Sequence, residues 1–541
     1  MTQHVMNSPT DRRALTAAIE RFSRKHDKGV FGPNQKKYEE LIPKTAPGPG
    51  KQYAFEVDLD KCTGCKACVT ACHSENGLDE DETWRGVGLI QGGTDDNAVL
   101  QHVTTACHHC ADPACLSGCP TLAYTKDEET GVVKHLDDQC FGCQYCILKC
   151  PYDVPKYNEK RGIVHKCDMC VGRLKAGQAP ACVRACPNGA IRITVVDTAE
   201  VRQNSREFVD VPGAPMSDYT YPTTKFKTAR RMPADARPAD DAAVKPEHSH
   251  LPLVVMLTLT QLSVGTFLYE WIATTFFGAA VIRPVLVTTA LAVGLAALGA
   301  SILHLGRPQL FYRAVLGFRQ SWLSREIIAF AAFAHVALLY AACVHLPALN
   351  QWLSGMIPGN DVLPVLSVAV VLLGMTGILA SVMVYRDTRR PFWDHPLTNI
   401  KFFATMGMLG SATGLLVAVA GGHAVPGAVR GLAVLISAVT VIKVVSEAAV
   451  FWLKDYANRP MIAKTAVLLR GPLHKYWRAR WVCGLTGGIV LPLGLASAAG
   501  SSPMATGMLA AAILLFCVAG ELASRYLFFR AVVAYRMPGG S

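Results

Sequence analysis

The chain has 541 residues, of which 51% are hydrophobic and only 17% are charged, and its mean hydropathy is +0.24. Soluble domains carry about 25% charged residues, so this composition excludes a wholly soluble protein. Residues 1–250 hold 33 acidic and 32 basic residues, whereas residues 251–541 hold 8 and 21, so the net charge of +12 lies in the apolar half. This excludes a basic nucleic-acid-binding protein and indicates a membrane protein with cationic loops.

The first 50 residues are expected to form an N-terminal extension. Arg12 and Arg13 make a twin-arginine pair, but charge returns before an apolar core of signal-peptide length can form. We therefore interpret residues 11–24 as a short amphipathic helix. A cysteine domain is expected over 51–200, and residues 201–250, which are rich in Pro, Ala, Asp and Arg, are typical of a linker or of a strap that lies on a neighbour.

Sixteen of the 19 cysteines form four groups. They are Cys62-x2-Cys65-x2-Cys68-x3-Cys72, Cys107-x2-Cys110-x4-Cys115-x3-Cys119, Cys140-x2-Cys143-x2-Cys146-x3-Cys150 and Cys167-x2-Cys170-x11-Cys182-x3-Cys186. The first and third match the bacterial ferredoxin run, in which three close thiolates hold one [4Fe–4S] cluster and the fourth reaches another. Isolated zinc sites explain one CxxC pair but not four such groups, and disulfides do not suit a reducing compartment.

Other residues near these groups receive lesser roles. His73, His108 and His109 adjoin cysteines and are expected to hydrogen-bond or pack near the clusters. The sequence has no C-x-x-C-H motif, so covalent c-type haem is not indicated. The three remaining cysteines lie in apolar runs, where free Cys behaves as a small hydrophobe. They are Cys343, Cys483 and Cys517.

The runs CTGCKACVTAC, CHHCADPACLSGCP, CFGCQYCILKCPYDVPKY and CDMC…CVRACP resemble the four-cluster electron-transfer subunit of dimethyl sulfoxide reductase-type molybdoenzymes. The resemblance covers residues 52–200 and implies a ferredoxin-like α+β domain with four [4Fe–4S] clusters. It implies these ligand sets: Cys62, Cys65, Cys68 with Cys186; Cys167, Cys170, Cys182 with Cys72; Cys107, Cys110, Cys115 with Cys150; and Cys140, Cys143, Cys146 with Cys119. Some relatives replace the residue that matches Cys143, and its presence implies a fourth [4Fe–4S] cluster here.

Residues 251–541 are predicted to form an all-α bundle of eight transmembrane helices, because eight apolar stretches approach the length of about 20 residues that crosses a bilayer. The stretches are 252–277, 284–305, 326–347, 362–384, 402–421, 429–453, 481–500 and 503–524. With eight spans, the N-terminus lies on the same side of the membrane as the C-terminal tail and the loops between spans 2 and 3, 4 and 5, and 6 and 7. Eighteen Lys and Arg residues fall in these loops and the tail, whereas Arg283 and Arg430 fall on the other side. The positive-inside rule then places the cysteine domain in the cytoplasm.

Ionisable residues in membrane spans are functional candidates. His304 and Glu326 lie on the cytoplasmic side and could exchange protons with a quinone; alternatively, they are hydrated or paired with Arg307 and Arg325. Lys443 and Glu447 are spaced to neutralise each other on one helix face. Glu270, Glu521 and His335 are expected to face the bundle interior. Paired axial histidines for haem b, such as His304 with His335, are conceivable but not expected.

The segment ASILHLGRPQLFYRAVLGFRQSWLSREI resembles the eight-span membrane-anchor subunit of the same reductases, and the resemblance extends over residues 251–530. There, a His in an HLG motif and a Glu 22 residues later serve quinol binding, which implies this role for His304 and Glu326. The anchors resembled lack haem.

The chain is therefore expected to be a fused electron-transfer and anchor subunit of the bacterial inner membrane, and no catalytic subunit itself. Its expected partners are a separate molybdopterin-containing catalytic subunit, menaquinone or ubiquinone, and the bilayer, with no nucleic acid. The well-known dimethyl sulfoxide reductases expose their iron–sulfur subunit to the periplasm, so the inward orientation favours a resemblance to the membrane-bound sulfite dehydrogenases, which implies sulfite oxidation with quinone reduction. One alternative is a dimethyl sulfoxide (S- or N-oxide) reductase that oxidises menaquinol; another is a quinol dehydrogenase that feeds cytochromes without molybdenum.

Overall fold

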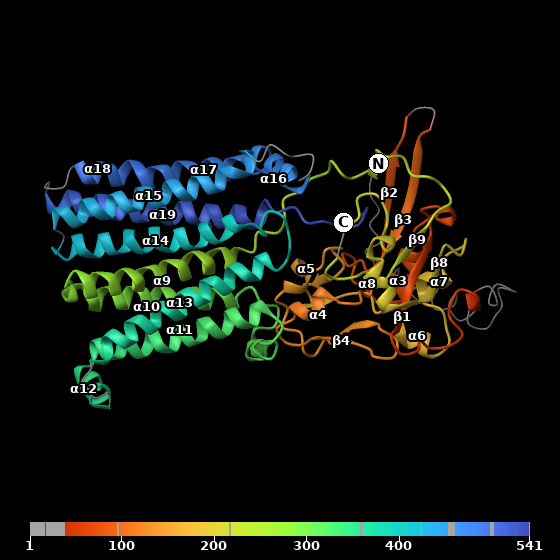
Figure 1. Cartoon of the computed structure of the whole chain (residues 1–541), viewed down its shortest axis with the longest axis horizontal. Helices are drawn as coiled ribbons and strands as arrows, with labels where there is room; N and C mark the ends of the chain where they lie inside the picture. The colour runs from red at the N-terminus through yellow and green to blue at the C-terminus, as the bar shows by residue number, and fades with distance from the viewer. Residues whose placement is uncertain are drawn as a thin grey trace.

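The computed structural model describes residue 17 and residues 38–94, 97–215, 218–356, 361–423, 425–452, 460–497 and 502–539. It has two parts side by side along the long axis (Figure 1): a cysteine half of short strands and helices, and a bundle of long helices. This confirms the predicted fold class. The helix predicted over residues 11–24 lies outside the described residues, apart from Ala17.

Four small sheets build the cysteine half. The strands are β1 (Lys51–Asp58), β2 (Gly86–Gly92), β3 (Val99–Thr105), β4 (Tyr124–Lys126), β5 (Val133–His135), β6 (Lys156–Asn158), β7 (Ile163–His165), β8 (Ile191–Asp197), β9 (Lys225–Lys227) and β10 (Arg237–Pro238). The sheet orders are β8-β1-β9, β10-β2-β3, β4-β5 and β6-β7. β1 lies in the middle of its sheet, and its Tyr53, Ala54, Phe55 and Val57 are all buried.

Short helices follow the cysteine loops. They are α3 (Ala67–Asn76), α4 (Ala114–Gly118), α5 (Tyr145–Lys149), α6 (Val171–Lys175) and α7 (Ala181–Arg184), and α8 (Thr198–Gln203) comes after them. In Figure 1, α4 and α5 lie next to the helix bundle, and α3, α6 and α7 lie at the far end. The cysteine groups are therefore spread along the long axis of the molecule.

The segment 218–250 lies on both halves of the protein as a strap. Its strand β9 pairs in parallel with β1, and β10 pairs antiparallel with β2. Farther along, Asp241 forms a 2.6 Å ion pair with Lys464, and the amide of Glu247 donates to the carbonyl of Arg530. Of the two interpretations of the sequence, the strap matches these contacts.

Among its described residues, the second half contains eight helical segments long and apolar enough to cross a membrane, as predicted. The helices are α9 (Leu251–Phe276), α10 (Arg283–Ile302), α11 (Trp322–His345), α12 (Pro347–Met356), α13 (Val362–Arg386), α14 (Pro396–Ala420), α15 (Pro426–Trp452), α16 (Pro460–Arg470), α17 (His474–Leu485), α18 (Leu491–Ser497) and α19 (Pro503–Arg530). α12 and α16 lie outside the spans, and a π-helical turn at Thr486–Val490 joins α17 and α18 into the seventh span.

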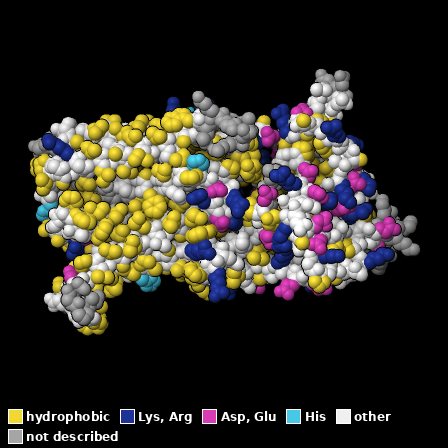
Figure 2. Space-filling model, in the orientation of Figure 1, with side chains coloured by type: hydrophobic (Ala, Val, Ile, Leu, Met, Phe, Trp, Pro, Cys, Tyr) yellow, Lys and Arg dark blue, Asp and Glu magenta, His cyan; other side chains and the backbone are white. Residues whose placement is uncertain are grey.

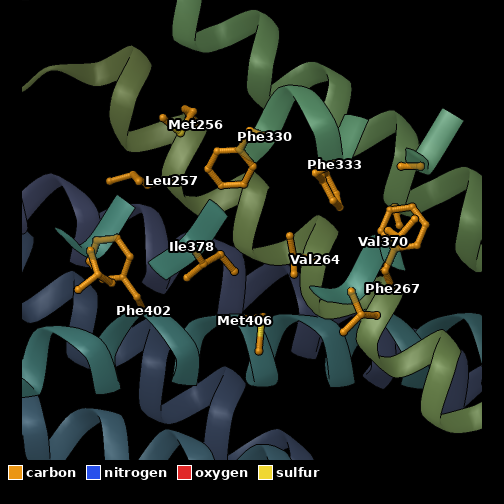
Figure 3. Close-up of a cluster of buried hydrophobic side chains, with 14 of the residues drawn as sticks. Met256, Leu257, Val264, Phe267, Phe330, Phe333, Val370, Ile378, Phe402 and Met406 are labelled. Carbon is orange, nitrogen blue, oxygen red and sulfur yellow. The ribbon is translucent and has the colours of Figure 1, made fainter. Parts of the chain in front are cut away.

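Aromatic and aliphatic side chains fill the interior of the bundle. Figure 3 shows Phe330 and Phe333 of α11 facing Val264 and Phe267 of α9 and Ile378 of α13. On the face shown in Figure 2, hydrophobic side chains also cover most of the bundle, whereas most Lys, Arg, Asp and Glu side chains gather on the cysteine half and where the halves meet. An apolar outer surface beside a charged belt is the pattern of a membrane-embedded bundle.

Several helix boundaries differ from the sequence prediction, with consequences for charged residues: α14 begins at Pro396 and contains Lys401, and α19 continues to Arg530 and contains Arg525. α11 begins at Trp322, which places Glu326 inside the helix, and α17 begins at His474 and therefore contains Arg480. Arg390, Arg480 and Arg525 were counted among the loop and tail bases, and all three are buried. The other bases in the connections remain on one end of the bundle, except that Lys454 and Arg459 lie outside the described residues.

The chain after α19 returns to the cysteine half. Met537 is buried in a core that also contains Ile90 and Val103, from β2 and β3. The backbone of Pro538 and Gly539 lies so close to Gly88 of β2 that a Cβ at Gly88 would clash with it. The tail thereby fastens the last transmembrane helix to the cysteine half.

Met537→Ala is expected to destabilise the cysteine half by about 2–5 kcal/mol, because truncating a buried Met loses burial and leaves a cavity. Thermal bleaching of cluster absorbance in the detergent-solubilised protein measures this, and the variant should bleach at lower temperature. Met508→Ala is the matched control, because Met508 is exposed on α19. Equal bleaching temperatures for the two variants and the wild type would show that the tail does not support this domain.

Candidate functional site: the cysteine sets and the membrane contact

The first and third cysteine groups have the same local backbone. In CTGCKAC and CFGCQYC, the Gly before the second Cys has a positive φ (Gly64, +72°; Gly142, +76°). The residue after that Cys caps the following helix in the left-handed conformation (Lys66, φ 60°; Gln144, φ 60°). These turns curl the chain so that three cysteines of each group point to one side, as a cluster-binding loop requires.

The structure brings the sixteen cysteines together in the four sets that the resemblance implies. We number the sets from the far end of the molecule: first (Cys62, Cys65, Cys68, Cys186), second (Cys72, Cys167, Cys170, Cys182), third (Cys107, Cys110, Cys115, Cys150) and fourth (Cys119, Cys140, Cys143, Cys146). Within each set, the thiols lie close enough to interact electrostatically. All four cysteines of the third set also line one small cavity.

The donor chemistry of these sets fits iron–sulfur clusters. All the cysteines are free thiols. Backbone amides donate to cysteine sulfurs from Ala123 to Cys119 (3.2 Å) and from Ala190 to Cys186 (3.2 Å), and such N–H···S bonds stabilise cluster-bound thiolates. No three His, Cys, Asp or Glu side chains in the described part of the chain could share one metal ion. A [4Fe–4S] site does not need that convergence, because each thiolate binds a different iron atom.

The three histidines beside the cysteines form hydrogen bonds near the sets, as predicted. His73 Nε2 lies 3.0 Å from the carbonyl of Asp79, and His108 Nδ1 lies 2.8 Å from the hydroxyl of Thr224. His109 Nδ1 accepts the amide of Val133 at 3.1 Å. Burial lowers the pKa of His108 to about 3, so this ring is neutral at neutral pH.

The four sets follow one another toward the membrane half. Cys68 of the first set interacts with Cys182 of the second, and Cys167 of the second interacts with Cys107 of the third. The ring of Tyr124 lies beside Cys115 of the third set and Cys146 of the fourth. The fourth set is therefore next to the bundle.

The loop after α10 contacts the fourth set directly. Gly306 packs against Gly142 and Gly162 so tightly that a Cβ on any of the three would clash with the backbone of another. The amide of Arg307 donates to the carbonyl of Phe141 at 3.0 Å. These contacts fix the membrane half against the loop that holds Cys140 and Cys143.

His304 belongs to this contact. Its Nε2 lies 3.2 Å from the carbonyl oxygen of Cys143, and its Nδ1 lies 3.3 Å from that of Ser301. Burial lowers the pKa of His304, although the two carbonyl contacts oppose the shift. Arg307 does not pair with it, because that guanidinium donates to the carbonyls of Arg161 and Asp137.

Glu326 is buried near the same cysteine loop. The hydroxyl of Ser381 on α13 donates to its carboxylate, and the side chain of Tyr145, one residue before Cys146, interacts with it electrostatically. Arg325 does not pair with Glu326; it lies over the ring of Trp322 at 4.4 Å and donates to a carbonyl. Neither candidate therefore pairs with its neighbouring arginine.

The remaining intramembrane candidates have mixed outcomes. Glu270 is buried as expected and binds Arg283 (3.0 Å) and the hydroxyl of Tyr340 (2.9 Å). Glu521 is also buried, in an ion network with Lys443. The prediction for His335 is wrong: the ring is exposed on the outer surface of α11 and bonds to the carbonyl of Ala331. His335 and His304 thus do not face each other.

Sequence reasoning missed several buried polar side chains near the cysteine sets and the membrane contact, and five of them enter the argument below. They are Arg85, Tyr124, Tyr145, Lys166 and Ser381. Lys166 and Tyr145 each adjoin a cysteine, which is a signal that the sequence offered. Arg85 and Ser381 lie far along the chain from the residues that they meet, so only the fold reveals them.

Comparison with known proteins agrees with this architecture. A model described as DMSO reductase anchor subunit (DmsC) matches residues 246–530. A 4Fe-4S binding domain model matches residues 53–74, and a 4Fe-4S dicluster domain model matches residues 98–196. Together these models cover both halves.

Individual relatives match the cysteine half. The B subunit of the anaerobic dimethyl sulfoxide reductase of Escherichia coli (strain K12) is 36% identical over 198 residues, which are 35% of this protein and 93% of that subunit. The iron-sulfur subunit of the nitrate-inducible formate dehydrogenase of the same strain is 36% identical over 168 residues, covering 27% of this protein and 57% of that subunit. Hydrogenase-2 operon protein HybA of Escherichia coli O157:H7 is 35% identical over 199 residues, which cover 32% of this protein and 59% of HybA.

Proposed function

Because the chain belongs to the DMSO reductase anchor subunit family and carries, on the same polypeptide, an iron–sulfur domain similar to the B subunit of dimethyl sulfoxide reductase, we propose that it transfers electrons between a separate molybdopterin-containing catalytic subunit and a membrane quinone. The observation that carries the proposal is the contact between His304 of the membrane half and Cys143 of the fourth cysteine set. It joins the last cluster site to the candidate quinone site through one hydrogen bond.

The four cysteine sets hold four [4Fe–4S] clusters in this proposal, and the clusters, when bound, supply one-electron transfer. The protein's part is to bury the sites, place them in sequence along the molecule and donate amides to their sulfurs. The first set, with Cys65 exposed, lies at the end away from the bundle and is the candidate contact for the catalytic partner.

His304 and Glu326 form the proposed quinone site. Both lie at the end of the bundle that faces the cysteine half, and both reach the loop of residues 143–146. His304 binds a quinone oxygen, and Glu326, held by Ser381, exchanges a proton with it. The quinone is menaquinone or ubiquinone, and no haem takes part.

The orientation follows from the basic loops. Arg307, Arg313 and Arg389 lie in connections that face the cysteine half, whereas Arg283 and Arg430 lie at the other end of the bundle. The positive-inside rule favours a cytoplasmic cysteine half in the bacterial inner membrane. Labelling spheroplasts with a membrane-impermeant lysine reagent should leave exposed Lys51 and Lys66 unmodified; strong labelling from outside would refute this orientation.

For the catalytic partner, the inward orientation supports sulfite oxidation coupled to quinone reduction. A second candidate, reduction of dimethyl sulfoxide with electrons from quinol, is favoured by the similarity to the B subunit of dimethyl sulfoxide reductase. Both use the same relay in opposite directions.

Metal analysis of the native complex, purified gently through this chain, tests the proposal. We expect about sixteen iron atoms per chain and one molybdenum atom, arriving with a large second polypeptide. Sulfite-dependent reduction of quinone by that complex supports the first substrate, and quinol-dependent reduction of dimethyl sulfoxide the second. Full iron without molybdenum or a large partner would refute the molybdoenzyme proposal and favour a quinol dehydrogenase that feeds cytochromes.

A further inference from the structure

A buried arginine lies between the first and second cysteine sets. Arg85 is only 2% exposed, and its guanidinium interacts with Cys68 of the first set and with Cys182, Cys167 and Cys72 of the second. One of its nitrogens donates to Thr104 at 3.2 Å, and the Thr104 hydroxyl is itself 3.5 Å from the sulfur of Cys68. The other terminal nitrogen is buried with no hydrogen-bond partner in the described part of the protein.

A buried lysine occupies the next junction. The ammonium of Lys166, which is 4% exposed, lies 3.7 Å from the sulfur of Cys107 of the third set and 2.9 Å from the carbonyl of Cys167 of the second. It also interacts with Cys115. Neither Lys166 nor Arg85 forms an ion pair with a carboxylate among the residues that the structure describes, although the half-buried Asp168 is near Lys166.

The junction nearest the membrane differs. Tyr124, a neutral side chain, lies between the third and fourth sets, next to Cys115, Cys119 and Cys146. The nearby Lys149 is compensated by a 2.8 Å ion pair with Asp387. The cation beside the fourth set is Arg307, which interacts with Cys140 but is half-exposed and therefore screened by water.

Burying an unpaired cation is costly, so Arg85 and Lys166 need a negative partner in their own surroundings. Clusters held by four thiolates carry net negative charge, and each becomes more negative by one on reduction. A fixed buried cation stabilises the reduced form more than the oxidised form because Coulomb interactions are strong where water is excluded. Local charge is one of the factors that set cluster potentials.

We propose that Arg85 and Lys166 are redox-tuning residues: Arg85 raises the reduction potentials of the first and second clusters, and Lys166 raises those of the second and third. The fourth cluster, beside the membrane, has no buried uncompensated cation among the described residues and keeps the lowest potential of the four. The inference rests on the proposed function in one respect, which is that each set binds a [4Fe–4S] cluster.

The placement of the two cations also bears on direction. Reduced clusters are stabilised on the side away from the membrane, so an electron delivered from quinol to the fourth cluster moves on a falling free-energy path to the third cluster and then to the second, which lies beside both cations. This order of potentials favours electron flow from quinol to the partner, as in the second candidate function. Sulfite oxidation needs flow in the opposite direction, which then depends on the potential of the partner's metal site or on a high-potential quinone.

Potentiometric titration of the intact complex, followed by the electron paramagnetic resonance of the reduced clusters, tests the proposal. Arg85→Gln keeps polar donors but removes the charge and should lower two of the four midpoint potentials. Lys166→Gln should also lower two midpoint potentials. One of them, that of the second cluster, is also lowered by Arg85→Gln, and the potential of the fourth cluster should change in neither variant. Arg85→Lys and Lys166→Arg keep the charge and should restore the wild-type values. Arg192→Gln, which removes a charge from an exposed side chain of β8, is the matched control and should leave the four potentials unchanged.

Unchanged potentials in both Gln variants would overturn the proposal, as would equal shifts of all four clusters. Equal shifts in Arg85→Lys and Arg85→Gln would show that Arg85 acts through packing on Phe55, whose ring lies 4.7 Å away, and not through charge. If the Arg85→Gln protein loses iron, the comparison of Lys166→Gln with Lys166→Arg tests the proposal by the same criterion. Iron far below sixteen in the wild type would instead refute the four-cluster proposal, so the two failures are distinguishable.

Discussion

Glu326→Gln is expected to lower quinone-linked turnover by about 100-fold or more, which is the usual worth of a positioned acid–base group, while the iron content stays at the wild-type level. Gln has the shape of Glu and can still contact Ser381, but it cannot take up or release a proton. The same loss is expected for His304→Gln. Turnover is measured with a soluble quinol analogue and normalised to iron, so that a loss of clusters cannot imitate a loss of quinone chemistry.

Two further variants separate this role from a structural one. Ser381→Ala removes the hydrogen bond that orients Glu326 and should give a smaller loss than Glu326→Gln. Glu270→Gln changes another buried carboxyl of the bundle, whose partners are Arg283 and Tyr340, and turnover per iron should remain at the wild-type level. If Glu326→Gln and His304→Gln both turn over normally, the quinone site is elsewhere.

Much of the cysteine domain could be predicted because its information is local. In Cys62-x2-Cys65-x2-Cys68, a single turn with Gly64 and Lys66 in left-handed conformations brings three thiols together, so the spacing alone indicates a cluster. Which distant cysteine completes each set is not local, and it came from the resemblance. Arg85 was missed for the same reason: nothing near it in the sequence is a cysteine, and β2 and β3 must fold before it meets Cys68 through Thr104.

The membrane half shows where hydropathy fails. α11 is apolar on all sides, so the sequence does not tell which side faces the bundle, and His335 turned out to be exposed. The basic turn before Trp481 resembled a loop because of its charge, yet it is the first part of α17. Arg480 is tolerated there because Glu447, on another helix, accepts it at 2.9 Å. A hydropathy window cannot detect compensation between helices.

That compensation is a four-charge network in the second half of the bundle. Lys443 of α15 pairs with Glu521 of α19 and lies 3.8 Å from Glu447. Arg480 of α17 binds Glu447 at 2.9 Å and Glu521 at 3.3 Å. Thr405 of α14 also donates to Glu521 at 2.7 Å. Two positive and two negative groups thus pair directly where water is excluded, and the buried Arg525 interacts with both carboxylates and donates to Thr405 at 3.2 Å.

Lys443→Met is expected to lower the free energy of unfolding of the bundle by about 3–5 kcal/mol, because removing one member of a buried pair leaves an uncompensated charge. Glu521→Gln should cost a similar amount. The double variant Lys443→Met/Glu521→Gln removes one positive and one negative group and so keeps the net charge of the network, and it should be more stable than the sum of the single losses implies. Denaturant unfolding of the detergent-solubilised protein gives all three values.

Lys464→Met is the matched control, because it removes one Lys from the partly exposed pair with Asp241, where an ion pair contributes about 0–1 kcal/mol. Strict additivity in the double variant, or a Lys443→Met loss no larger than that of Lys464→Met, would contradict the network. A loss confined to Lys443→Met and Glu521→Gln, with partial recovery when both change, would mean that charge balance holds these four helices together. Replacing one ion at a time is then the least tolerated change in this bundle, whereas paired apolar replacements are accepted.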